Sequence, residues 1–333
     1  MQESDFREYC RHRGFTQTVE DAAVAFVREF EDDLTAEGAG SPETTTITAL
    51  SHYLQLLVRS GRNSEERLLA LARYMAVIRR NDAFIYLALV VEAPGILPAL
   101  RERTRDLAGA TTADAVFASL QLPPAGSPLD AYPPVTAEIL DRLQQRLPPD
   151  TCRRVLTGNM HRIPTEQFND AAERFRAFPD VDAFLEDRHA RLVRELEEHM
   201  NQHRLWYEQE ITPEVLELVR NNKEIQSGVR DGDTIFVTKI PFSPQAYLHE
   251  TDPVRKRFDA CHCPLARSAI LTGSPAISPL LCRCSAGYEK LPFDVVFGEP
   301  VEIDVLESVL GGGTRCRFAI TIPPGFRKPS ASP

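Results

Sequence analysis

Cysteine side chains gather near the end of this 333-residue chain. Five of the seven cysteines fall in its last quarter: Cys261, Cys263, Cys282, Cys284 and Cys316. The other two, Cys10 and Cys152, stand alone. Thiols that persist in a reducing compartment serve as metal ligands, as nucleophiles or as small buried apolar groups. The clustering favours the first of these roles.

Four of the clustered cysteines form two Cys-x-Cys pairs, Cys261-His262-Cys263 and Cys282-Arg283-Cys284. In an extended segment both sulfurs of such a pair project to the same side, so each pair can ligate one ion jointly. Pro264 and Ser285 are typical of helix starts. The cysteine before each would then lie at a positively polarised helix end, which favours its thiolate.

A carboxylate is expected beside these thiols. Apolar and polar side chains alternate through residues 301–322 on both sides of three glycines, which predicts an antiparallel hairpin. Glu307 lies in the apolar row, and a four-residue loop sets it opposite Cys316 with the Cβ atoms roughly 5 Å apart. A carboxylate turned into a core costs on the order of several kcal/mol unless a cation meets it. A metal ion would supply this positive charge. The alternatives are a salt bridge from Glu307 to Arg315 or Arg317, or a different strand register that exposes Glu307 to water.

Zinc is the metal that this ligand chemistry favours. The predicted ligands are Cys261, Cys263, Cys282, Cys284, Glu307 and Cys316. They exceed the four places on tetrahedral zinc, so some lie outside its coordination shell or the site is larger. Iron, cuprous copper or a cluster remain alternatives. So do inert buried thiols and a redox disulfide.

The same positions carry a resemblance to known families. The residues that carry it are Cys263-Pro264, Cys282 to Cys284, Gly287-Tyr288, Phe297-Gly298-Glu299-Pro300-Val301, Glu307 and Gly312-Gly313-Thr314-Arg315-Cys316-Arg317-Phe318. This series resembles the C-terminal pattern of the 4-vinyl reductase domain, which the zinc-containing phenol-sensing domains of bacterial regulators share. It is also similar to the L-2-amino-thiazoline-4-carboxylic acid hydrolase family. The match spans roughly residues 225–323, about a third of the chain.

The resemblance implies a ligand set and a choice of functions. The sensors hold zinc with cysteines and a glutamate, which implies Cys284, Glu307 and Cys316 here. Their further cysteine after the glutamate has no counterpart, because residues 308–310 read Ser-Val-Leu. Similarity to the hydrolases implies an enzyme in which a metal activates water or a thiolate attacks. Similarity to the sensors implies a binding module with a structural zinc.

We favour the hydrolase, with a small-molecule substrate and no catalytic residue assigned. The sequence shows no ATPase motif and no basic recognition helix that would serve as a sensor's output. No general acid and base pair stands out for an enzyme either, so the sensor remains the alternative. Domains of the resembling type commonly dimerise, which makes a homodimer an expectation.

The charge and the apolar content of the chain argue against two classes of partner, nucleic acids and membranes. The formal net charge of −10 gives no electrostatic reason to bind nucleic acid or an anionic membrane surface. The N-terminus lacks the apolar core of a signal peptide, and the apolar run Phe84–Val91 is too short to cross a bilayer. We therefore expect a cytoplasmic protein that binds neither nucleic acid nor membrane.

These residues must be held by a mixed α+β fold, a helical N-terminal region followed by a C-terminal α/β domain with an antiparallel hairpin. Apolar residues at helical spacing predict helices over residues 21–36, 50–58 and 68–78, and a buried helix over 84–91 that Pro94-Gly95 terminates. The run 235–240 predicts a strand. The expected divisions are a helical domain (1–122), a Pro-rich linker (123–134), a helical segment (135–223), the metal-binding domain (224–325) and a disordered tail (326–333).

Two further groups of residues have spacing that suits chemistry. His199 and His203 lie four apart on an expected helix, the spacing for joint metal binding, although Met200 stands where a metalloprotease motif has its glutamate. A partly buried helix face is the competing interpretation. Residues 247–252 carry Tyr, His, Glu and Asp ahead of the first cysteine pair, and a solvated surface loop is the simpler interpretation there.

Overall fold

The chain forms two compact units in a computed structural model that describes residues 1–326. One unit comprises residues 1–96 and 121–132, and the second comprises 97–120 and the chain from 133 onward. Helices fill the N-terminal part and a small antiparallel sheet lies in the C-terminal part, so the expected α+β class is confirmed. All but the first residue of the expected disordered tail, 326–333, lies outside the described residues.

The first unit is built from helices. They are α1 (Glu3–His12), α2 (Gln17–Ala36), α3 (Ile47–Arg59), α4 (Glu65–Val77) and the start of α5 (Asn81–Ala108), with a 3₁₀ turn η1 (Leu129–Ala131). The hydroxyls of Thr16, Thr46 and Ser64 each accept a backbone N–H three residues on and so cap α2, α3 and α4. The apolar stripes of these helices meet in one buried core that includes Phe30 and Leu54.

Helix α5 is longer than the sequence predicts. Pro94-Gly95 does not end it, and the helix continues for 28 residues. An interior proline costs roughly 3 kcal/mol, but side chains such as Leu87, Val90 and Leu97 are buried, each contributing about 1.5–3 kcal/mol. By length and composition this is the one helix within residues 1–326 that could cross a membrane, and half of its apolar stretch is buried inside the protein.

The observed boundaries differ from the expected divisions. The segment expected as a linker packs back on the first unit, where Asn63 Nδ2 donates to the Ala125 carbonyl (2.7 Å) and Leu129 contacts the core. Residues 97–120, expected in the first domain, belong to the second unit together with both later segments. Proline content signalled the loss of α-helix at residues 123–131, but Pro133 and Pro134 lie in the first turn of α7, where proline is tolerated, and the composition did not show where the chain would pack.

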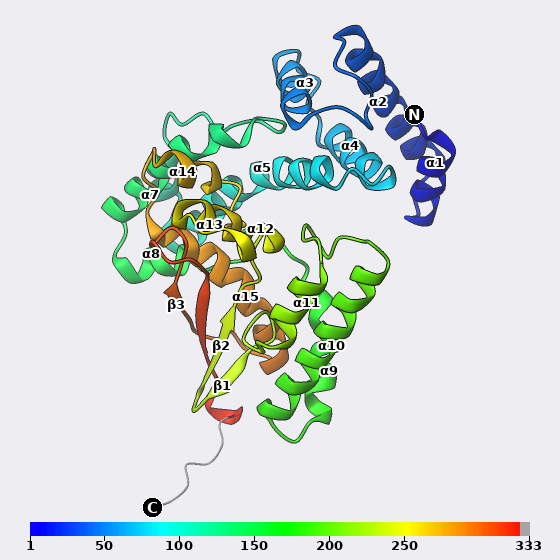
Figure 1. The fold of residues 1–333 in the computed structure, drawn as a ribbon. Helices are drawn as coiled ribbons and strands as arrows, with labels where there is room; N and C mark the ends of the chain where they lie inside the picture. Colours follow the sequence, from blue (N-terminus) through cyan, green and yellow to red (C-terminus); the bar gives the residue numbers. More distant parts are fainter. Residues whose placement is uncertain (327–333) are drawn as a thin grey trace, which may run out of the picture. The chain divides into compact units, whose positions relative to one another are not determined.

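The second unit holds the remaining elements, shown in Figure 1. Its helices are α6 (Ala110–Phe117), α7 (Tyr132–Arg146), α8 (Pro149–Leu156), α9 (Asn169–Ala177), α10 (Val181–Asn201), α11 (Pro213–Arg220), α12 (Pro244–His249), α13 (Pro253–Ala260), α14 (Arg267–Thr272) and α15 (Cys282–Phe297). Its strands are β1 (Val229–Asp231), β2 (Thr234–Thr238), β3 (Ile303–Glu307) and β4 (Arg317–Thr321), and its 3₁₀ turns are η2 (Thr165–Phe168), η3 (Pro279–Leu281) and η4 (Pro324–Phe326).

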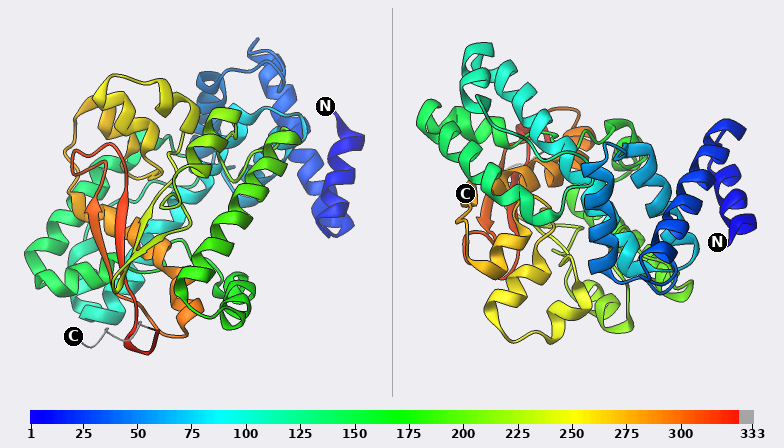
Figure 2. Two further views of the ribbon diagram at one scale, coloured as in Figure 1. Left: turned by 60° about the horizontal axis from the view of Figure 1, so that its bottom comes forward. Right: turned by 90° about the horizontal axis from the view of Figure 1, so that it is seen from above.

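The four strands form one antiparallel sheet in the order β1-β2-β4-β3. Alternate residues such as Ile235, Phe318 and Ile320 are fully buried on one face. They share a core with Phe293 of α15 and Phe184 of α10. Figure 2 shows α15, in orange, running behind the strands. The expected strand at 235–240 and the expected hairpin are thus both present.

Helix α15 approaches the loop after α8 closely, through glycine. A Cβ built on Gly287 would lie 2.5 Å from the carbonyl oxygen of Gly158, which is closer than real Cβ contacts allow. Only glycine therefore permits this packing of helix against backbone. The contact fixes residues 157–161 beside the first two turns of α15.

Gly287→Ala is expected to destabilise the protein by about 1–3 kcal/mol, because backbone has to move to admit the methyl group. Gly95→Ala is the matched control: it is also helical, it has open space around it, and its stability should be unchanged or raised by up to about 1 kcal/mol. Urea denaturation followed by circular dichroism measures both. Equal stability of the two variants would contradict the close approach.

Candidate functional site

Three segments of the second unit bring the five cysteines together. Cys261 and Cys263 lie in the connection between α13 and α14, Cys282 and Cys284 in the first turn of α15, and Cys316 directly before β4. Four of them are nine-tenths or more buried, and Cys263 is half-buried. None forms a disulfide.

The thiols are close enough to influence one another's ionisation. Burial raises the pKa of Cys261 to about 12, and a charge on Cys316 adds to the shift. Burial likewise raises the pKa of Cys316 to about 12, with a contribution from Cys282. The pKa of Cys263 lies well above its ordinary value because of burial and the neighbouring Cys261, Cys284 and Cys282. All five sulfurs thus form one group, which we call the thiol cluster.

Hydrogen-bond donors point at four sulfurs of the thiol cluster. The backbone N–H groups of Cys263, Leu265 and Val309 lower the pKa of Cys261, Cys263 and Cys316 respectively, opposing the effect of burial. The Ser308 hydroxyl and the N–H of Leu310 act in the same way on Cys282. Neutral thiols are weak acceptors, whereas thiolates attract such donors.

The second cysteine pair does not have the extended geometry that the sequence suggests. Helix α15 begins at Cys282, so Cys282 and Cys284 lie in its first turn and their side chains diverge around the helix axis. The first pair follows the prediction: Cys261 is extended, and His262 between the sulfurs turns away to Ile240, with Nε2 2.7 Å from the carbonyl oxygen.

Helix ends do not lower the pKa of Cys263 as expected. Burial among other thiols outweighs the polarised end of a short helix, and the pKa rises. The raised pKa values of Cys261, Cys263, Cys282 and Cys316 keep these four thiols neutral at pH 7 when no cation is bound.

Glu307 does not lie opposite Cys316. The predicted register holds from Ile303, paired with Ile320, to Val305, paired with Phe318, but a β-bulge then shifts the pairing by one residue. Glu307 consequently faces Arg317 across the strands. An extra residue in one strand reverses which face later side chains occupy, and alternation alone does not reveal it.

The carboxylate of Glu307 has protein partners. Its Oε2 accepts from Arg315 Nε at 2.8 Å, and its Oε1 accepts the N–H of Thr314 at 3.1 Å. This is one of the salt bridges that the sequence left open. The side chain lies against Gly313, where a Cβ would meet the Glu307 Cγ at 2.4 Å. The last of the three glycines therefore leaves room for this carboxylate.

His161 is the partner that sequence reasoning missed. Its Nε2 lies 3.5 Å from the Cys284 sulfur, and its ring packs edge-on against Tyr288 with the centroids 5.7 Å apart. The two residues are separated by more than a hundred positions in sequence. The signal for their contact was Gly287, whose close approach to Gly158 brings the loop carrying His161 to the start of α15.

The thiol cluster has the donor chemistry of a soft-metal site. Within the part of the chain that the structure describes, no group of three or more His, Cys, Asp or Glu side chains has the arrangement of a metal site. Joint coordination of an ion therefore requires the sulfurs to move from the positions seen here. The donors at four sulfurs fit thiolates better than thiols.

A cavity of about 230 Å³ is lined in part by Tyr288 and Glu289 of α15, the helix whose first turn carries Cys282 and Cys284. Glu289 is buried, and Lys239 Nζ lies 3.5 Å from its Oε1 and 4.8 Å from the Tyr288 ring centroid. Both charges act on Cys316: Lys239 lowers its pKa and Glu289 raises it. The cavity and the thiols thus share the first turns of α15.

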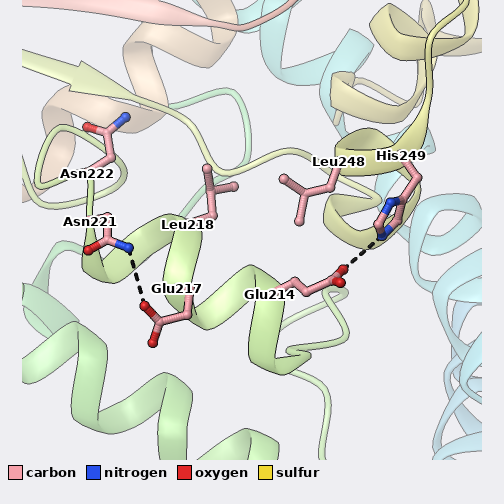
Figure 3. Close-up of a pocket in the computed structure, with 7 residues that line it drawn as sticks. All are labelled: Glu214, Glu217, Leu218, Asn221, Asn222, Leu248 and His249. Atoms are coloured by element: carbon pink, nitrogen blue, oxygen red, sulfur yellow. Dashed lines mark hydrogen bonds and ion pairs between the residues drawn. The ribbon is translucent and has the colours of Figure 1, made fainter.

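A second hollow, of about 440 Å³, lies on the surface between α11 and α12 (Figure 3). His249 Nε2 lies 2.8 Å from Glu214 Oε2 there, and both side chains are more than half exposed. Of the other residues in 247–252, Asp252 caps α13 and Glu250 accepts backbone N–H groups. These roles are structural, but the stretch is not simply a solvated loop, because residues 247–249 end helix α12 and Tyr247 packs against the buried core.

The histidine pair on the long helix does not share a face. Helix α10 ends at Asn201, so His203 lies beyond it with a positive φ of 52°. His199 Nδ1 lies 2.7 Å from the carbonyl oxygen of Leu205. The pair serves to terminate the helix.

Comparisons with protein-family models, curated proteins and solved structures gave no match. The resemblance to 4-vinyl reductase domains and thiazoline carboxylate hydrolases therefore stays a prediction from sequence motifs.

Raising the pH is expected to destabilise the metal-free protein. Folding raises the pKa of Cys282 to about 11 and that of Cys261 and Cys316 to about 12, from an ordinary 9.0. Because the unfolded chain loses these protons first, stability that is present below about pH 9 falls as the pH rises toward 12. Urea midpoints with EDTA and a phosphine reductant should therefore fall from pH 8 to pH 10.

The double variant Cys261→Ala, Cys316→Ala is the control for this titration, and its midpoint should fall less over the same interval. A midpoint for the unsubstituted protein that stays constant from pH 8 to pH 10 would contradict the raised pKa values.

Proposed function

We propose that the second unit is a zinc-dependent or thiol-dependent hydrolase of a small organic molecule. The observation that carries the proposal is the gathering of five thiols, four buried and one half-buried, from three separate segments around donors that suit thiolates. Burying so many ionisable groups without a cation would serve no purpose that apolar side chains could not serve better.

Four thiols would hold the metal: Cys261, Cys263, Cys282 and Cys316, each with a hydrogen-bond donor at its sulfur. Four thiolates complete a tetrahedral zinc site. Bound zinc would lock the three segments together and so position the fifth thiol, Cys284, beside His161. Glu307 is not in the proposed set, because Arg315 already neutralises it.

Cys284 and His161 would be the reacting pair. With 3.5 Å between Sγ and Nε2, the imidazole is placed to take the thiol proton. The sulfur would then attack the carbonyl carbon of an amide, and the imidazolium would give its proton to the departing amine, leaving a thioester on Cys284. Water attacking the resulting thioester, with His161 as base, releases the acid and restores the thiol. Tyr288 packs on His161 and lines the neighbouring cavity, which supplies a place for the substrate.

A sensor with a structural zinc is the second candidate. The observation in its favour is the burial of the thiol cluster, since closed all-cysteine sites are typical of structural zinc. Metal and ligand binding without turnover would favour this function over the hydrolase.

Metal content tests the first part of the proposal. Protein purified without added metal should carry about one equivalent of zinc per chain, and Cys282→Ser and Cys316→Ser should each retain a small fraction of it. Elemental analysis by mass spectrometry measures this. Glu307→Ala should keep the metal, and so should Cys152→Ser, which removes a buried thiol outside the cluster. Equal metal content in all five proteins would overturn the metal site.

Turnover tests the second part. A panel of cyclic thioimidates and amides, followed by chromatography of the products, should show hydrolysis by the unsubstituted protein and loss of about a hundredfold or more in rate for Cys284→Ala and His161→Ala. Cys152→Ser is the matched control and should be fully active. A Cys284→Ala variant as active as the control would remove the thiol from the mechanism.

A further inference from the structure

Arg267, the first residue of α14, is a buried cation beside the thiol cluster. It is 8% exposed, and its backbone N–H donates to the carbonyl of Cys263 at 3.0 Å. Its guanidinium lies 4.1 Å from the ring centroids of both Phe242 and Phe258, and its Nη2 donates to the Ser243 hydroxyl at 3.3 Å. Its Nε is buried without a hydrogen-bond partner. Arginine is rarely buried to this extent unless an opposite charge pairs with it.

The stronger of the two negative partners of Arg267 is a cysteine. Among the described residues, no carboxylate oxygen lies within the 4.0 Å of an ion pair with its guanidinium. Burial lowers the pKa of Arg267 to about 10, and Cys261 opposes this shift more than the half-buried Asp259 does. A cysteine acts on a cation in this way only as a thiolate. The main counter-charge available to Arg267 is therefore a sulfur of the thiol cluster.

Lys239 is a second cation at the thiol cluster. It follows β2 directly, and its backbone N–H donates to the carbonyl of Cys316 at 2.9 Å. Its charge lowers the pKa of both Cys261 and Cys316. Its Nζ also lies 3.5 Å from Glu289 Oε1, so part of this charge is already balanced. Arg267 is thus the cation with the greater need of a counter-charge.

The charge on the thiol cluster depends on whether an ion is bound. Four thiolates around one divalent ion carry two net negative charges. Burying such a centre is costly unless positive groups surround it. Without the ion the same thiols are neutral, and Arg267 has no charged sulfur beside it. Ion binding would therefore compensate the buried guanidinium and the buried thiolates together.

We propose that Arg267 is the counter-ion of a tetrathiolate metal centre built from the four thiols already named as ligands. The proposal rests on the proposed function and deepens it, because it assigns the residue that makes four buried thiolates tolerable. Arg267 binds neither the metal nor the substrate. It is a positioning residue that acts through the charge it places beside the sulfurs.

Arg267→Met tests this role, because it removes the charge while an unbranched thioether still packs between the two phenylalanine rings. The zinc affinity of the full-length protein, measured by competition with a chromophoric chelator, should fall by about tenfold or more. A unit charge acting across several ångströms at an effective dielectric constant of about 20 has an effect of this size. Arg267→Lys keeps the charge and should recover most of the loss. Arg267→Gln replaces the Met variant if circular dichroism shows that Met prevents folding.

Arg67→Met is the matched control. Arg67 is also 8% exposed, and its guanidinium lies 4.6 Å from the Phe26 ring centroid, but it belongs to the first unit and pairs with Glu29 at 2.6 Å. Its variant should bind zinc as tightly as the unsubstituted protein. Zinc affinity reduced equally in Arg67→Met and Arg267→Met would overturn the assignment, because loss of stability would then account for both.

Iron bound in place of zinc reports the charge itself. Four thiolates carry two net negative charges with ferrous iron and one with ferric iron, so a neighbouring cation favours the reduced centre. The reduction potential of iron-loaded Arg267→Met should therefore fall by about 59 mV, which is a tenfold change for one electron. Arg267→Lys should stay closer to the unsubstituted protein. A redox titration followed by thiolate-to-iron absorption measures this, and a potential that is unchanged or higher in Arg267→Met would overturn the counter-ion.

Metal uptake by the unsubstituted protein separates this inference from the proposed function. Protein that takes up neither zinc nor iron overturns the metal site and the counter-ion with it. Metal held with the same affinity and potential by Arg267→Met and by the unsubstituted protein overturns the counter-ion alone and leaves the metal site standing.

Discussion

The gathering of the five thiols of the cluster, four of them buried and none in a disulfide, is the constraint around which the C-terminal half is arranged. Taking ionisable groups out of water raises the pKa of three of them to about 11 or 12 and so keeps them protonated. The surrounding N–H and hydroxyl donors act in the opposite direction. Burial thus favours the neutral thiols, whereas the donors favour thiolates. A bound cation would favour thiolates too, because each charged sulfur would then interact with both the ion and its donor.

Helix α15 links this cluster to the neighbouring cavity. Its first turn carries Cys282 and Cys284, Gly287 admits the loop that holds His161, and Tyr288 and Glu289 line the cavity. Two turns of this one helix, which packs on the sheet, therefore position the Cys284 thiol, the His161 imidazole and one wall of the cavity. A shift of α15 along its axis would change all three together, which makes the contact at Gly287 more than a matter of stability.

The sequence predicted the strands correctly and the site only in part. Period-two alternation gave the right register between β3 and β4 as far as Val305 because the buried face there is continuous. The prediction failed at Glu307 because the alternation of apolar and polar residues does not reveal a β-bulge. The bulge shifts the register by one residue, so the Glu307 carboxylate pairs with Arg315 instead of facing the thiols. Likewise the spacing of Cys282 and Cys284 does not reveal whether the chain there is extended or already helical. The clustering of the cysteines was nevertheless recognisable, since five thiols in one quarter of a chain have few arrangements that keep them apart.

The contacts among the residues that line the cavity could not be predicted from local sequence patterns. Helical periodicity placed Leu192 and Leu196 on the buried stripe of α10, but nothing in that stripe indicates that Arg188 would face Glu289 and Phe293 of a helix about a hundred residues later. Such pairings depend on how whole elements pack, and a charged residue on a helix is usually solvated. Arg188 is such an exception: it is half-buried, its Nη2 donates to the Gln226 carbonyl at 3.0 Å, and the carboxylate of Glu289, on a different helix, acts on its charge.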